Sequence, residues 1–125
     1  MTGKQLEQRR KELQEEMNAK GFGWINGNYV EPPQEYKIRE KELGCINMIN
    51  SILAYDWHND TAEEIMQKQE KAYKNYLSPY IAALGRAKVL DLIQEQINSI
   101  VRINRNVATD SEGCSYNSII WVDEV

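Results

Sequence analysis

The chain has 125 residues and a mass of 14.5 kDa, which allows one domain with its own core and is too short for two cores of ordinary size. Hydrophobic residues make up 42% and charged residues 27% of the sequence, as in globular proteins. The net charge of -4 at pH 7 disfavours direct nucleic-acid binding, which depends on clustered Lys and Arg. No apolar run approaches the roughly 18 residues that span a membrane, and no signal-peptide stretch begins the chain. These features predict a cytoplasmic protein.

A first helix is predicted from Thr2 to about Lys20. Thr2 and Gln5 have the spacing of a capping box, and Gly21 supplies the stop. The apolar seam of this segment is narrow, consisting of Leu6, Leu13 and Met17. Such a stripe buries little surface, so we expect a peripheral amphipathic helix over residues 1–20. The same thin face also permits a homodimer.

A short hairpin is predicted over residues 22–30. Asn26-Gly27 lies between Trp24-Ile25 and Tyr29-Val30, and Asn-Gly tolerates the positive φ angles of a type I′ turn. Because so short a hairpin is unstable alone, its aromatic side chains should pack on the rest of the protein. Pro32 and Pro33 end the strand and open the next helix.

A helical core is predicted over residues 34–104, beginning with a helix from about Gln34 to Tyr55. Its apolar residues recur at steps of three, four and seven: Tyr36, Leu43, Ile46, Ile49, Leu53 and Trp57. Gly44 inside this helix costs roughly 1 kcal/mol relative to alanine, which indicates close approach of another backbone.

Two further helical segments follow in the predicted core. Thr61 and Glu64 are spaced as a second capping box, and the apolar face that follows extends to Ser78-Pro79: Ile65, Ala72, Tyr73, Tyr76 and Leu77. A short helical turn then ends at Gly85.

The strongest helical periodicity of the chain lies between Gly85 and about Ile103, and predicts the central helix of the fold. Its apolar residues are Val89, Leu90, Ile93, Ile97, Ile100 and Val101.

The C-terminal segment changes to a period of two. Tyr116, Ser118 and Ile120 fall on one face of a strand, and Asn117, Ile119 and Trp121 fall on the other. Residues 106–109 form its predicted partner, with Gly113 in the turn, so a hairpin is expected over residues 105–123. The sequence thus predicts a mainly helical α+β domain of four to five helices with an N-terminal-region hairpin and a C-terminal hairpin. Whether the two hairpins share one sheet stays open.

The sequence lacks the residues that several common kinds of active site require. His58 is the only histidine, so a His-rich zinc site is excluded, and no metal or cofactor is expected. We interpret Cys45 and Cys114 as two free thiols, because two cysteines are too few for a disulfide framework. A functional loop with Cys114 as nucleophile would need His58 as its base, and a small buried residue in a turn is the simpler interpretation. A P-loop, a dinucleotide-binding glycine motif and a serine nucleophile elbow are all missing.

One candidate site for acid and base chemistry surrounds Trp57. Asp56, His58 and Asp60 would make it an enzyme site, since carboxylates near an imidazole can exchange protons. The simpler interpretation is that Trp57 is buried while Asp60 and Thr61 cap the next helix.

A second candidate site combines basic, amide and aromatic residues. Arg102, Arg105 and Asn106 leave the last helix, with Tyr116 and Asn117 nearby on the returning strand. Arginine forks with such neighbours suit an anionic nucleotide or an acidic protein surface. The alternative is an ordinary solvated helix face, on which Arg102 joins Asp91, Glu95 and Asn98.

Acidic residues gather in two stretches. Between Asp56 and Glu70 five acids accompany the single basic residue Lys68, and four acids from Asp110 to Glu124 have no basic residue among them. Brought together, these stretches could imitate nucleic acid or dock a basic partner, and Asp110 and Glu112 are candidate binding residues in the second one. A solvated acidic face is the simpler interpretation.

Residues 84–121, "LGRAKVLDLIQEQINSIVRINRNVATDSEGCSYNSIIW", resemble small uncharacterised accessory proteins carried by phages and mobile elements of gut Firmicutes. The resemblance covers about a third of the chain and carries over no catalytic or binding residue. It implies a short acidic protein that acts by binding, as anti-CRISPR proteins and other inhibitors of host defence do. We therefore expect a non-enzymatic inhibitor of a bacterial defence protein in the host cytoplasm. A nucleotide-binding protein and an enzyme using Asp56 and His58 are the alternatives.

Overall fold

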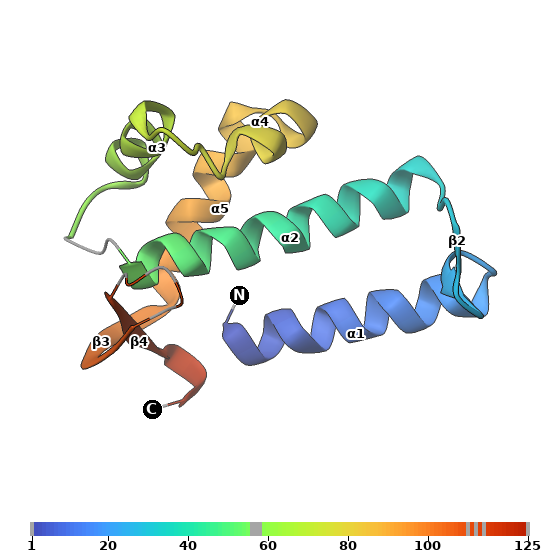
Figure 1. The fold of residues 1–125 in the computed structure, drawn as a ribbon, viewed down its shortest axis with the longest axis horizontal. Coiled ribbons are helices and arrows are strands. Elements are labelled where there is room, and N and C mark those ends of the chain that lie inside the picture. The colour runs from blue at the N-terminus through green and yellow to red at the C-terminus, as the bar shows by residue number, and fades with distance from the viewer. Residues whose placement is uncertain (1, 56–58, 110, 112, 114, 125) are drawn as a thin grey trace.

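The structure is a computed structural model that describes residues 2–55, 59–109, 111, 113 and 115–124, with the backbone alone for residues 105–108 and 124. It confirms a mainly helical α+β fold with two hairpins (Figure 1). In chain order the elements are α1 (Gly3–Ala19), β1 (Gly23–Ile25), β2 (Asn28–Val30), α2 (Gln34–Tyr55), α3 (Ala62–Lys71), α4 (Ser78–Leu84), α5 (Arg86–Ser99), β3 (Ile100–Thr109), β4 (Ser115–Trp121) and the 3-10 turn η1 (Val122–Glu124).

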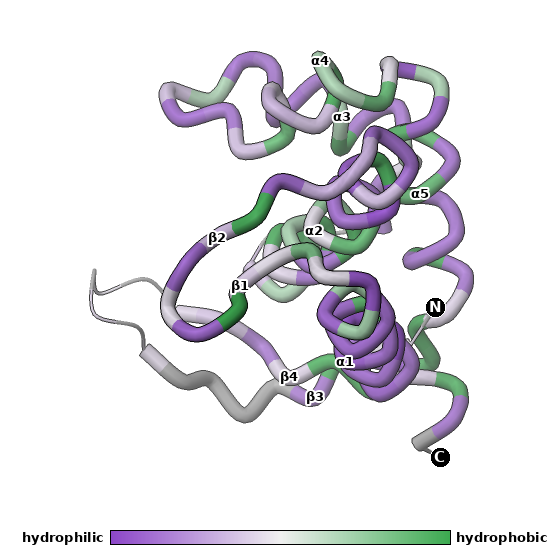
Figure 2. The backbone as a smooth tube through the Cα atoms, turned by 90° about the vertical axis from the view of Figure 1, so that its right-hand side faces the viewer, coloured by the Kyte–Doolittle hydropathy of each residue, from purple (hydrophilic) through white to green (hydrophobic). Residues whose placement is uncertain are grey.

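The first helix has the predicted start and the predicted place. The Thr2 hydroxyl accepts a hydrogen bond from the Gln5 main-chain N–H, and the Gln5 side chain accepts one from the Thr2 N–H, so the capping box is complete. Leu6, Leu13 and Met17 are buried. The helix lies beside α2 on the outside of the fold and is mostly hydrophilic along its length (Figure 2).

The first hairpin also has its predicted turn. Asn26 and Gly27 take φ angles of 52° and 79°, as a type I′ turn requires. The expectation that its aromatic side chains would pack on the rest of the protein was wrong for Trp24 and Tyr29. These two rings contact each other, with centroids 5.4 Å apart, and remain 64% and 49% exposed.

The longest helix, α2, is the element around which the fold is arranged. It has the predicted bounds and buries Tyr36, Cys45, Ile46, Ile49, Ile52 and Leu53. It contacts α1, α4, α5 and β4. Gly44 is closely approached by the Tyr80 side chain, 3.3 Å from where a Cβ would stand, and not by another backbone as predicted.

The apolar face expected beyond α3 forms at Leu77, which is buried in the core, but not at Ala72, Tyr73 and Tyr76. The helix ends at Lys71, and Tyr73 is fully exposed, while Tyr76 is also exposed. Ala72 takes an extended conformation, and the Asn75 side chain accepts a hydrogen bond from the Leu77 main-chain N–H. This local bond offers the backbone an alternative to continuing the helix.

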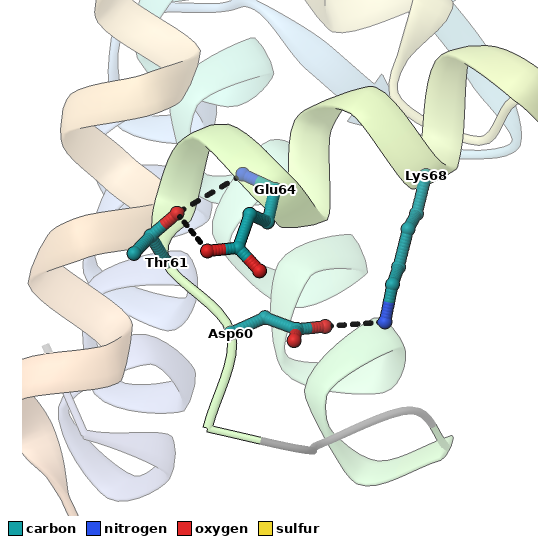
Figure 3. A network of polar contacts seen from close by, with 4 residues as sticks. All are labelled: Asp60, Thr61, Glu64 and Lys68. Carbon is teal, nitrogen blue, oxygen red and sulfur yellow. Dashed lines mark hydrogen bonds and ion pairs between the residues drawn. The ribbon is translucent and has the colours of Figure 1, made fainter.

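The capping box predicted at Thr61 is half formed. Its hydroxyl accepts a hydrogen bond from the Glu64 main-chain N–H, as an N-cap does. The Glu64 carboxylate accepts from that same hydroxyl and not from the Thr61 backbone (Figure 3).

The last helix ends four residues before the predicted Ile103. Its final residue is Ser99, and β3 begins at Ile100, which pairs with Trp121 of β4. β-branched residues at Ile100, Val101 and Ile103 suit the strand as well as the helix, and pairing with β4 decides between them. Arg102 therefore lies on a strand, and the C-terminal hairpin starts earlier than predicted. In the described part of the chain the two hairpins form separate two-stranded sheets.

The end of the C-terminal hairpin packs against the start of α1. Trp121 is buried, and its indole nitrogen lies 3.0 Å from where a Cβ of Gly3 would stand. The Thr2 hydroxyl, itself buried, donates a hydrogen bond of 3.1 Å to the Asp123 carboxylate. The two ends of the described chain thus hold one another.

A glutamine occupies the apolar core. Gln96 of α5 is 0% exposed, and both its amide oxygen and its amide nitrogen are buried without a hydrogen-bond partner. It follows Val89, Leu92 and Ile93 on the buried face of α5. An unsatisfied buried amide is costly, so this side chain destabilises the core that surrounds it.

We predict that Gln96→Met raises the free energy of unfolding by about 1–3 kcal/mol, because a side chain of similar length removes the unsatisfied amide. Urea denaturation followed by circular dichroism measures the change. Gln67 of α3 is exposed, so Gln67→Met should stay within about 0.5 kcal/mol of wild type. A loss of stability in Gln96→Met would contradict the prediction.

The two threonine caps should differ in their contributions. Thr61→Ala is expected to cost about 1 kcal/mol of unfolding free energy, as loss of an exposed N-cap does. Thr2→Ala should cost about 1 kcal/mol more, since it also removes the hydrogen bond to Asp123. In a double-mutant cycle, Asp123→Ala should destabilise the wild type and leave Thr2→Ala nearly unchanged. If the double variant lost the sum of the unfolding free energies lost by Thr2→Ala and Asp123→Ala, the two residues would not be coupled.

Candidate functional site: a groove between α2 and β4

A groove with a volume of about 390 Å³ runs between the C-terminal half of α2 and β4. Its lining carries amides, hydroxyls and aromatic rings and, among the described residues, no charged side chain: Asn47, Asn50, Ser51, Ala54, Tyr55, Tyr116, Asn117, Ser118, Ile119 and Trp121. The volume lies in the range of ordinary ligand pockets. We call it the α2–β4 groove.

One face of α2 forms the first wall. Five residues of this wall are spaced three, one, three and one positions apart, which places them on a single side of the helix: Asn47, Asn50, Ser51, Ala54 and Tyr55. The buried apolar residues of α2 lie between them in sequence and point elsewhere, as Ile49, Ile52 and Leu53 do. The helix therefore presents a polar stripe to β4 and an apolar one to the core.

Three contacts define the groove more closely. The Asn117 amide donates a long hydrogen bond of 3.5 Å to the main-chain oxygen of Ala54. The Tyr55 and Tyr116 rings lie with centroids 5.6 Å apart, so the end of α2 meets the start of β4. The Oδ1 atom of Asn50 is buried and has no hydrogen-bond partner. This unsatisfied oxygen belongs to a residue that lines the groove, but the oxygen itself is inaccessible from it.

Two of the predicted site residues, Tyr116 and Asn117, lie in the α2–β4 groove. Arg102 does not join them: it is exposed on β3, opposite Ile120, and does not line the groove. Arg105 and Asn106 belong to β3 by their backbone, and their side chains fall outside what the structure describes.

The sequence analysis missed the α2 wall. Asn47, Asn50 and Ser51 have the spacing of the solvated side of an amphipathic helix, and nothing local distinguishes them from one. One signal could have indicated this wall. The helix is otherwise rich in Glu and Lys, but this stripe carries amides and hydroxyls without charges.

The candidate acid–base site falls mostly outside the description, because Asp56, Trp57 and His58 are not among the described residues. Asp60 is described, and its carboxylate forms an ion pair with Lys68 beside the Thr61 cap (Figure 3). Across the described ranges, no group of three His, Cys, Asp or Glu side chains could hold a metal ion.

The first acidic stretch is largely paired within the fold. Arg86 forms ion pairs with both Glu63 and Glu70, and Lys68 pairs with Asp60. In the second stretch Asp123 accepts the hydrogen bond from Thr2. Asp110 and Glu112, the candidate binding residues of this stretch, lie outside the described residues.

Cys45 lies in the core and Cys114 outside the described residues. Burial raises the pKa of the Cys45 thiol from its ordinary 9.0 to about 11, because the low-dielectric surroundings disfavour the thiolate. A thiol in this state is a packing group and a poor nucleophile at neutral pH.

No protein-family model matches the chain, and neither the curated proteins nor the solved structures include a match. Among the described residues, no helix is both long and apolar enough to cross a membrane.

The Cys45 pKa predicts a pH dependence of stability. Between pH 9 and 11 the unfolded chain releases the thiol proton while the folded chain keeps it, so the free energy of unfolding falls as the pH rises, by about 2–3 kcal/mol from this group. Cys45→Ala should lack this contribution. The difference in unfolding free energy between wild type and variant should therefore shrink from pH 8 to pH 11 in urea titrations, and a constant difference would refute the assignment.

Proposed function

We propose that the protein is a non-enzymatic binding protein that holds a partner protein in the α2–β4 groove. The observation that carries the proposal is the lining of this groove, which combines uncharged amides and hydroxyls with the aromatic rings of Tyr55, Tyr116 and Trp121. Aromatic rings supply contact area at low entropic cost, and amides hydrogen-bond to both donors and acceptors. This combination is typical of surfaces that recognise polypeptides.

The same lining argues for binding over catalysis. General acid–base chemistry uses groups that titrate near the working pH, and the described lining has no carboxylate, imidazole, ammonium or thiol. The alternative of an enzyme using Asp56 and His58 rests on residues outside the description.

A partner protein also fits the groove better than an anionic nucleotide does. Phosphate binding calls for Arg, Lys or a cluster of main-chain N–H groups, and the described groove lining has no basic side chain. The nucleotide alternative would instead need Arg102 and Arg105, on β3.

The class of partner follows from the resemblance of residues 84–121 to phage and mobile-element accessory proteins. On that basis we propose a bacterial defence protein as the partner and inhibition as the outcome, as anti-CRISPR proteins do. β4, which forms one wall of the groove, lies inside the resembling segment.

Filling the groove tests this function. Ala54 lies on the α2 wall, so Ala54→Trp should block it, while Ala87→Trp on the exposed side of α5 is the matched control. Tagged wild type and both variants would be recovered from lysate of a phage-infected host, and native mass spectrometry would identify what accompanies them. We expect one defence protein with wild type and Ala87→Trp, reduced at least tenfold with Ala54→Trp.

Circular dichroism and thermal unfolding would establish that both variants fold. Equal recovery of the partner with folded Ala54→Trp would place binding elsewhere and contradict the proposal. A bound mass of a few hundred daltons in place of a protein would favour the nucleotide alternative.

A further inference from the structure

We propose that the connection between α3 and α4 carries a second docking surface, which binds an acidic segment of a partner protein. The surface consists of two tyrosines and two lysines, and we call it the α3–α4 surface: Lys71, Tyr73, Lys74 and Tyr76. Figures 1 and 2 show α3 and α4 on one side of α2 and the hairpin of β3 and β4 on the other. The inference therefore does not depend on the α2–β4 groove.

The local backbone leaves the rings of Tyr73 and Tyr76 in water. Helix α3 ends at Lys71, and the chain is next held at Leu77, which is fully buried and whose main-chain N–H donates to the Asn75 side chain. Between these two points Tyr73 is fully exposed and Tyr76 is 46% exposed. Among the described residues, neither side chain has a hydrogen bond or a ring contact. Exposed aromatic rings are enriched where proteins contact one another.

Positive charge gathers in this part of an acidic chain. Residues 71–90 contain four basic residues and no acidic one, although the net charge of the chain is -4. Arg86 and Lys88 form ion pairs with acidic side chains of α3 and α2. Lys71 and Lys74 are exposed and have no acidic partner within the described ranges. Their ammonium groups are therefore available to the carboxylates of another molecule.

The chemistry of the α3–α4 surface determines what the bound segment contains. Lysine ammonium groups and tyrosine hydroxyls both donate hydrogen bonds to carboxylates, and tyrosine rings pack on apolar side chains. The four residues come from a stretch of six, which spans at most about 20 Å when extended. An acidic segment of about six residues, with apolar side chains between its carboxylates, would cover this stretch.

A nucleic acid fits this surface less well than an acidic segment does. Two free ammonium groups can neutralise two phosphates, whereas the affinity of proteins for nucleic acids rests on many such contacts. A phosphate backbone that continued along α3 would meet Glu63, Glu64 and Glu70, which would repel it. A short segment that ends at the surface avoids these carboxylates.

A second copy of the chain is also a poor occupant. Helices α1, α2 and α5 each carry as many basic residues as acidic ones. In the two acidic stretches, every acidic side chain that the structure describes already has a partner inside the fold: Asp60, Glu63, Glu64, Glu70 and Asp123. A contact between this surface and a different surface of a second copy would also repeat from copy to copy into a ring or filament. These properties favour a segment of another protein.

The test selects twelve-residue peptides of unrestricted sequence from a phage-displayed library on the whole protein. Peptides that also bind the double variant Lys71→Glu, Lys74→Glu are removed, which sets aside those held elsewhere. We expect the remaining peptides to be acidic. In isothermal titration calorimetry, the best one should bind at least tenfold more weakly once Asn and Gln replace its Asp and Glu. The double variant Tyr73→Ala, Tyr76→Ala should weaken binding at least fivefold, because it removes both rings.

The matched control is the double variant Lys4→Glu, Lys11→Glu, which changes the net charge equally at two exposed positions of α1. This control and Ala54→Trp, which blocks the groove, should bind the peptide as wild type does. Circular dichroism would establish that all variants fold. The proposal falls if no peptide survives the selection, if the amide form of the peptide binds equally well, if the folded tyrosine variant binds as wild type does, or if either control loses the peptide.

Two further measurements would identify another occupant and overturn the proposal. One is tighter binding of a twelve-nucleotide thymidine strand than of the peptide, lost in Lys71→Glu, Lys74→Glu, which would make the surface a nucleic-acid site. The other is association of wild type in sedimentation velocity that the same variant abolishes, which would make a second copy the occupant. We expect the strand to bind more weakly than the peptide and the two proteins to sediment alike.

Discussion

Burial around α2 is the constraint on which the rest of the structure depends. This helix contacts α1, α4, α5 and β4, and Ile49 and Leu53 are almost completely buried by them. Neither α1, with its thin seam, nor α4, which buries none of its residues, could stabilise a fold by itself. Each of these neighbours takes its position by packing on a different part of the α2 surface. The one stripe of α2 that carries amides and hydroxyls is left facing the α2–β4 groove.

Contacts at the two ends of the chain hold the second wall of that groove in place. A two-stranded hairpin is marginally stable in water, and β3–β4 gains its support from outside its own sheet. Ile119 packs on the main core, Trp121 is buried against Gly3, and Asp123 accepts the Thr2 hydroxyl. These anchors hold the far end of β4, while Asn117 and Tyr116 hold its start against the end of α2. The position of the groove is therefore coupled to the N-cap of α1.

Local chemistry determined which parts of the fold could be predicted. The Thr2 cap, the Asn26-Gly27 turn and the start of α2 after Pro33 depend on neighbouring residues, and the structure confirms all three. The end of α5 depends on pairing with a distant strand, and its prediction was wrong. For the same reason the strand that carries Tyr116 and Asn117 could be predicted from its alternating pattern. The helix face that carries Asn47 and Asn50 could not be predicted to line a groove. A polar stripe on a helix resembles a solvated face until another element lies across from it.

Among the described residues, three amide side chains have a buried atom without a hydrogen-bond partner: Asn50, Gln69 and Gln96. Gln96 is sealed in the core, so its cost is borne in every state of the folded protein. Asn50 lines the groove as a residue, but its unsatisfied oxygen is as inaccessible as the amide of Gln96, so a molecule in the groove gains no hydrogen bond from it. The affinity of the groove for a partner therefore has to come from groups that stay accessible. On the α2 wall these belong to Asn47, Ser51 and Tyr55, which are exposed. Their cost of losing water falls on binding and not on folding, so each favours a partner only where that partner replaces the hydrogen bonds to water.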